Sequence, residues 1–197
     1  MQAGRRRASD SCCMLLALPA TLQKSEIHFP PVSFIRRFGT VYKATLRKEH
    51  AVAVKTMRVA KITQLELSKF KSEVIIMAPL HHPHLVRLWG GVWNEGADKL
   101  CIVLEFCANG SLKSFLKVDP GTWAGVRHGL EVGTAKGLAY LHHELSEPLI
   151  HRDIKPANIM LYEHANRPDQ VKLLDFGIAK IVRDSDAFTH ESLTGAN

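Results

Sequence analysis

The sequence predicts an α+β fold with two segregated layers, one rich in strands and one rich in helices, and a cleft between them. Strand patterns dominate the first half of the chain, where a single helical pattern interrupts them, and helical patterns dominate the second half. The chain has 197 residues and 46% of them are hydrophobic, which is enough for one domain or for two small lobes that share a core.

Strand patterns define most of the first half. Residues 1–33 show no sustained period and are expected to form an irregular tail. Residues 40–59, TVYKATLRKEHAVAVKTMRV, predict two strands joined by a polar turn at Lys48–His50. Two further strands are expected at residues 85–93, LVRLWGGVW, and at residues 100–106, LCIVLEF.

One helix is predicted in the first half, over residues 63–80, TQLELSKFKSEVIIMAPL. Thr63 followed by Glu66 has the spacing of a capping box, which marks a helix N-terminus, and Pro79 marks the end. The apolar residues at helical spacing are Phe70, Val74 and Met77. This helix is therefore expected to pack one face against the strands.

Helical patterns are stronger in the second half. Residues 110–116 predict a short helix and residues 126–143 a longer one. The longer helix places on one face the apolar residues Val126, Leu130, Leu138 and Leu141. The polar loop IHRDIKPANIML, residues 150–161, and the strand with its following glycine, VKLLDFG, residues 171–177, come next.

Charge and cysteine usage exclude several classes of protein. The net charge of +7 comes partly from Arg5–Arg7. The sequence shows no basic stripe interleaved with aromatics, which is the pattern that would predict nucleic-acid binding. The four cysteines show no CxxC spacing, which favours a reducing compartment and a cytoplasmic location. No apolar run approaches the length of a membrane span.

Lys55 is the first candidate for chemistry. Strand alternation in AVAVK places Ala51, Ala53 and Lys55 on one face. Two small side chains and a cation would form a shelf for a flat base, with a charge within reach of a phosphate. The alternative is a lysine at a strand end that extends to water.

Glu73 is the second candidate. On a helical wheel it falls within the apolar arc that Phe70, Val74 and Met77 define, whereas a solvated glutamate belongs on the opposite face. A carboxylate on a buried face requires a cation, and Lys55 is the obvious partner. The alternative is a position at the edge of the arc that reaches water.

The third candidate is the loop HRDIKPAN, residues 151–158, with DFG downstream. Asn158 and Asp175 offer hard oxygen ligands, which suit Mg²⁺ bound together with substrate phosphates. Asp153 would then be free to orient a hydroxyl and accept its proton, and Lys155 would offset charge on a transferred phosphoryl group. Any one of these side chains alone could be an ordinary polar loop residue.

The motifs FGTVYKA, VAVK, HRDIKPAN and DFG together resemble those of eukaryotic protein kinase catalytic domains. The resemblance runs from about residue 38 to residue 195. It implies a partial kinase domain over 34–197, with a small lobe of antiparallel strands and one helix over about 34–104. A hinge would follow at about 105–109, and a mainly helical, incomplete large lobe at about 110–197.

The resemblance also implies roles for individual residues and the use of ATP and Mg²⁺. Lys55 and Glu73 would form the ion pair that places the phosphates, Asp153 would be the catalytic base assisted by Lys155, and Asn158 and Asp175 would bind magnesium. Contacts to the nucleotide are implied for Gly39, Val41, Ala53, Lys55, Leu104, Glu105, Cys107 and Met160. A buried regulatory stack is implied for Met77, Leu88, His151 and Phe176.

Substrate and regulation follow from the same resemblance. Lys155 after HRDI is similar to the serine/threonine-specific pattern, and FKSEVIIMAPLHHPHLVRLWGGV resembles the tyrosine-kinase-like group. A protein substrate with a serine or threonine hydroxyl is therefore implied. Arg152 beside Asp153 implies an upstream activating kinase, with candidate acceptors at Ser185, Thr189, Ser192 and Thr194.

The chain departs from the family pattern at two places. Gly39 matches the last glycine of the phosphate loop, but Phe34 and Arg36 stand at the other two glycine positions, which predicts weakened nucleotide affinity. The chain also ends before the family's APE motif, so the large lobe is expected to be incomplete. Two alternatives stay open: a pseudokinase-like module that binds a nucleotide or a partner, and a fragment that does not fold alone.

Overall fold

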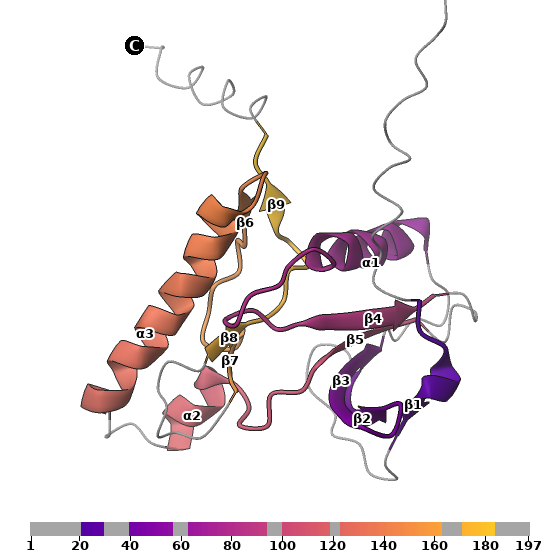
Figure 1. Ribbon diagram of the computed structural model, residues 1–197, viewed down its shortest axis with the longest axis horizontal. Helices are drawn as coiled ribbons and strands as arrows, with labels where there is room; N and C mark the ends of the chain where they lie inside the picture. Colours follow the sequence, from indigo (N-terminus) through magenta and orange to yellow (C-terminus); the bar gives the residue numbers. More distant parts are fainter. Residues whose placement is uncertain are drawn as a thin grey trace, which may run out of the picture.

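The computed structural model describes residues 21–29, 40–56, 63–93, 100–118, 123–162 and 171–183. Five strands form one antiparallel sheet with helix α1 beside it, and helices α2 and α3 lie on the other side of the molecule with two short strand pairs (Figure 1). The predicted α+β arrangement of a strand-rich layer and a helix-rich layer is confirmed.

The sheet has the order β1-β2-β3-β5-β4. Its strands are β1 Ile27–His28, β2 Thr40–Leu46, β3 His50–Thr56, β4 Leu88–Val92 and β5 Cys101–Glu105. The β2–β3 hairpin pairs Leu46 with His50, so the turn lies one residue earlier than predicted. Arg47 and Lys48 adopt left-handed backbone angles there, with φ of 49° and 63°, which closes the tight turn.

Residues 21–29 are part of this sheet, and the expectation of an irregular tail up to residue 33 is wrong for them. The Leu22 amide donates to the Gly91 carbonyl at 3.0 Å on β4, while β1 pairs with the end of β2. A short 3-10 helix, η2 Lys24–Glu26, separates the two contacts. The segment therefore connects the two ends of the strand order, and residues 1–20 and 30–33 lie outside the described residues.

Helix α1, Gln64–Met77, begins as the sequence predicts. Glu66 donates its amide to Thr63 Oγ1 at 3.2 Å, and the Glu66 carboxylate accepts from the Thr63 amide at 2.9 Å. This capping box satisfies two of the backbone donors that a helix N-terminus leaves unpaired. The predicted apolar face is buried at Phe70, Val74 and Met77.

The second layer contains α2 Leu112–Val118 and α3 Trp123–Ala139, which continues into a π-helical turn, η4 Tyr140–Glu144. The short strands are β6 Leu149–Ile150, β7 Ile159–Leu161, β8 Val171–Leu173 and β9 Lys180–Ile181, paired as β6–β9 and β7–β8. Gly137 lets α3 approach β8 closely, because a Cβ there would lie 3.1 Å from both the His84 carbonyl oxygen and a Leu173 methyl.

The larger buried cluster crosses both layers. It contains side chains of α1, β4 and β5 together with side chains of α3, β7 and β8, among them Val74, Ile102, Leu130, Ile159 and Leu173. A second cluster lies on the other face of the sheet, where Leu22 and Ile27 pack with side chains of all four longer strands. Both faces of the sheet therefore carry buried apolar side chains. Within the described ranges, no helix is both long and apolar enough to cross a membrane.

Candidate active site

Lys55 and Glu73 form the predicted ion pair. Lys55 Nζ lies 2.6 Å from Glu73 Oε1, which brings the end of β3 to the inner face of α1. The Glu73 side chain is 12% exposed, so it is not a solvated position at the edge of the helix. A carboxylate with so little solvent is stabilised by the partner charge.

Asp175 lies beside this pair. Its Oδ1 is 3.9 Å from Lys55 Nζ, and its backbone adopts a left-handed φ of 75°, which is uncommon outside glycine. Gly177 leaves the carboxylate uncovered, because a Cβ at that position would lie 3.3 Å from Asp175 Oδ1 and 3.9 Å from Glu73 Oε2. The structure thus brings together Lys55, Glu73 and Asp175 from three separate segments.

The Asp153 carboxylate is bound by side chains of its own loop. Lys155 Nζ lies 2.8 Å and 2.6 Å from its two oxygens, and Asn158 Nδ2 donates to Oδ2 at 2.8 Å and to the Asp153 carbonyl at 2.9 Å. The hydrogen bond from the Lys155 ammonium is the main cause that lowers the pKa of Asp153 below its ordinary value. The carboxylate is therefore ionised at neutral pH.

His151 links the Asp153 loop to the segment that carries Asp175. Its Nδ1 accepts the Asp153 amide at 3.2 Å, so Nε2 carries the proton and donates to the Leu174 carbonyl at 3.2 Å. The Leu174 amide in turn donates to the Asn158 carbonyl at 2.9 Å. Burial lowers the pKa of His151, which favours the neutral ring that this arrangement requires.

The residues of the predicted regulatory stack are all buried. Met77, Leu88, His151 and Phe176 are each at most 7% exposed, and the ring centroids of His151 and Phe176 are 4.8 Å apart. Sequence reasoning named His151 only for this packing. Its hydrogen bonds to both motif segments were missed, although a polar ring within an apolar stack is a signal that such partners exist.

The residues expected to contact a nucleotide base come from adjacent strands. In the sheet, Val41 is the register partner of Lys55, and Ala53 is that of Leu104. Met160 lies in β7, across from Ser111. Gly39 lies outside the described residues, as do Phe34 and Arg36.

The hinge residues have distinct local chemistry. The Glu105 amide donates to the Arg87 carbonyl at 2.9 Å, so this amide is already bonded within the protein. Burial raises the pKa of the Cys107 thiol to about 12, which keeps it protonated and unreactive. Sequence reasoning assigned only the backbone of Glu105 a role and missed the side chain's contact with Lys172.

The oxygen donors at this site fit a magnesium nucleotide. Both described bonds of the Asn158 amide nitrogen go to Asp153, which leaves Asn158 Oδ1 as a hard oxygen donor, and the Asn158 carbonyl bonds Leu174, the residue before Asp175. Within the part of the chain that the structure describes, no cluster of three or more His, Cys, Asp and Glu side chains forms a metal cage. Mg²⁺ typically uses few protein ligands together with phosphates and water, so this sparse set suits it.

The chain matches the family described as protein kinase domain over residues 37–196. It is 34% identical over 174 residues to the G-type lectin S-receptor-like serine/threonine-protein kinase LECRK3 of Oryza sativa subsp. indica, covering 88% of this chain and 21% of that protein. It is 38% identical over 161 residues to the G-type lectin S-receptor-like serine/threonine-protein kinase RLK1 of Arabidopsis thaliana, covering 80% of this chain and 18% of that protein.

The chain therefore belongs to the protein kinase domain family. Members of this family use ATP and Mg²⁺ and act on protein substrates. The chain spans about a fifth of the length of the curated relatives it matches.

Proposed function

We propose that this chain carries the catalytic residues of a protein serine/threonine kinase, which transfers the γ-phosphoryl group of ATP to a protein hydroxyl. The observation that carries the proposal is the convergence of Lys55, Glu73 and Asp175, joined through Leu174 to the Asp153 loop. Family membership and the names of the relatives support the same reaction.

Each polar side chain then has a role in the transfer. Asp153 accepts a hydrogen bond from the substrate hydroxyl, orients it and takes its proton. Lys155 offsets negative charge on the transferred group, and Lys55, held by Glu73, positions the phosphates. ATP would supply the phosphoryl group, and Mg²⁺, when bound, would neutralise charge on its phosphates. Asn158 and Asp175 are the residues that would hold the metal.

The base of the nucleotide would lie between the sheet and β7. The sheet side of this base pocket, its upper surface, would be formed by Val41 and Ala53. The β7 side, its lower surface, would be formed by Met160, and Leu104 would form the inner wall. The backbone of the hinge at Glu105 and Cys107 supplies hydrogen bonds to the base edge. The Glu105 amide already bonds Arg87, so Glu105 would contribute its carbonyl and not its N–H.

Phosphoryl transfer to a serine- and threonine-rich test protein would examine the proposal. With Mg·ATP, the parent chain is expected to label serine or threonine, identified by phosphoamino-acid analysis. Asp153→Asn removes the proton acceptor and should reduce the rate about 10²–10⁴-fold, while nucleotide binding is retained. Labelling that survives in Asp153→Asn, or labelling of tyrosine alone, would contradict the proposal.

A second candidate is a module that binds a nucleotide or a partner without phosphoryl transfer. Phe34 and Arg36 at the loop glycine positions favour it, because both side chains restrict close backbone approach to phosphate. Mg·ATP binding by the parent chain without any transfer would select this module. The upstream activating kinase and the cytoplasmic location stay predictions, and the candidate acceptors between 185 and 194 lie outside the described residues.

A further inference from the structure

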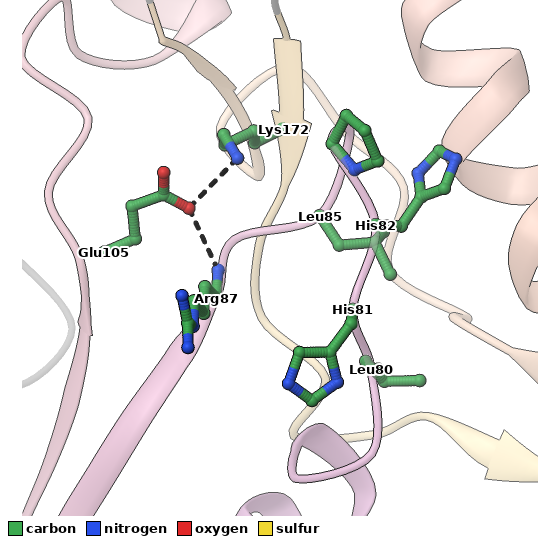
Figure 2. A pocket seen from close by; sticks show the side chains of 8 residues that line it. Leu80, His81, His82, Leu85, Arg87, Glu105 and Lys172 are labelled. Atoms are coloured by element: carbon green, nitrogen blue, oxygen red, sulfur yellow. Dashed lines mark hydrogen bonds and ion pairs between the residues drawn. The ribbon is translucent and has the colours of Figure 1, made fainter.

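The side chain of Glu105 points away from the predicted base pocket. Side chains alternate along β5, so Glu105 shares the face of Val103, whereas Leu104 points toward the opposite face. Glu105 lines a cavity of about 350 Å³ together with Arg87 and Lys172 (Figure 2). The carboxylate is therefore available for a function separate from the hinge backbone.

One carboxylate oxygen of Glu105 links β5 to β8 and to the segment just before β4. Lys172 Nζ of β8 lies 3.0 Å from Glu105 Oε2, and the Arg87 amide donates to the same oxygen at 3.2 Å (Figure 2). The Glu105 amide returns a bond to the Arg87 carbonyl at 2.9 Å. The hinge strand is thus bonded in both directions to the residue before β4 and is also linked to the second layer.

The ion pair is well shielded from solvent. The side chains of Lys172 and Glu105 are 11% and 17% exposed, so solvent and salt screen their attraction less than that of a surface pair. Lys172 Nζ also lies 4.5 Å from the centre of the Tyr162 ring, a cation–π contact that helps fix its position. A buried lysine of this kind needs its partner, because an unpaired charge would be strongly destabilising.

The two partners belong to opposite sides of the base pocket. In the β7–β8 ladder Lys172 is the register partner of Met160, the predicted lower surface. Glu105 directly follows Leu104, whose register partner Ala53 belongs to the upper surface. We propose that Glu105 and Lys172 are positioning residues, which fix the hinge relative to the lower surface of the base pocket. This inference rests on the proposed function and specifies how its nucleotide site is held.

The proposal makes separate predictions for the two ends of the nucleotide. Loss of the ion pair would displace the hinge backbone, including Cys107 two residues further on, and so weaken contacts to the base. Because the hinge hydrogen bonds to the base edge would lengthen or break, we expect about a tenfold to hundredfold loss in adenosine affinity. The ion-pair partners of Lys55 are Glu73 and Asp175, so the affinity for Mg·pyrophosphate should stay within about twofold.

Calorimetric titration of the 197-residue chain with adenosine and with Mg·pyrophosphate would test this. The variants are Lys172→Met and the double variant Glu105→Gln/Lys172→Met, which removes the link without leaving a buried unpaired charge. Lys172→Arg keeps a cation and should restore adenosine affinity to near the parent value. Lys117→Met, which removes an exposed lysine at the end of α2, is the matched control and should leave both affinities unchanged.

The outcomes separate this inference from the function on which it rests. A parent chain that binds neither ligand would contradict the proposed function itself. A parent that binds both, with variants that lose neither or lose both equally, would overturn the positioning role alone. Tighter adenosine binding in the variants would also overturn it, as would a double variant without a cooperative melt, because the pair would then be a folding requirement.

Discussion

Asp153 shows how a single loop prepares a carboxylate for chemistry. Lys155 and Asn158 both donate to it, and the hydrogen bond from Lys155 is the main cause of its lowered pKa. A proton acceptor must be ionised before it can act, so this environment serves the proposed role directly. The same contacts hold the side chain in one orientation, with its backbone amide fixed by His151.

The pKa of Asp153 should depend on the Lys155 ammonium. Replacing the ammonium in Lys155→Met should raise that pKa toward its ordinary value, which ¹³C NMR of the Asp153 carboxyl carbon can measure. A carboxyl group with a lowered folded pKa contributes stability above its unfolded pKa, near 4, and loses it as pH falls through the folded pKa. Lys155→Met should therefore lose less stability on acidification below about pH 4 than the parent does.

Lys117→Met serves as the control for this titration. It removes one exposed positive charge on α2, which is distant in sequence from Asp153, and should leave the Asp153 pKa unchanged. An Asp153 pKa that is the same in the parent and in Lys155→Met would show that the ammonium does not hold the carboxylate in solution.

At the scale of elements, local sequence determines some parts of the fold and not others. Helix α1 could be predicted because its capping box and apolar spacing lie within one short segment. Glu73 could be paired with Lys55 from two local patterns. The helical period placed Glu73 on the apolar face of its helix, and strand alternation placed Lys55 on the face of Ala53. Lys172 could not be assigned a partner, since strand alternation alone would place it toward solvent, and its partners Glu105 and Tyr162 lie on other segments.

The N-terminal segment was missed for a related reason. Leu22 and Ile27 are five positions apart without a period, and their partners lie on strands far along the chain. Leu22 is 3% exposed, so Leu22→Ala should lower the free energy of unfolding by about 2–4 kcal/mol. Urea denaturation measures this directly. Ser25→Ala, an exposed position in the same segment, should change it by less than about 0.5 kcal/mol, and equal effects of the two variants would contradict the packing.

The sequence of the phosphate loop should limit nucleotide affinity. Phe34 and Arg36 stand where the family pattern has glycine, and they restrict both positive φ and the approach of backbone amides to phosphate. Phe34→Gly/Arg36→Gly should therefore increase the affinity for Mg·ATP, measured by titration calorimetry. An unchanged affinity would mean that Lys55, the metal ligands and the hinge already supply the binding.

For the whole molecule, the two layers are expected to unfold together. The larger buried cluster contains side chains from α1 and the sheet as well as from α3 and β8, so neither layer keeps its core without the other. The predicted two lobes with a shared core are consistent with this arrangement. A nucleotide would contact both layers and should stabilise the whole chain, because a ligand that binds only the folded state raises its stability.

A thermal melt of residues 1–197 with and without Mg·ATP tests this expectation, beside an Asp175→Asn control. At a ligand concentration about a hundred times Kd, the folded state should gain about 2.7 kcal/mol, which appears as a raised Tm. Asp175→Asn removes a carboxylate proposed to bind the metal and should abolish most of the gain. A melt raised equally in both proteins would place nucleotide binding elsewhere. A chain without any cooperative transition would not fold alone, and its motifs would then act only within a longer protein.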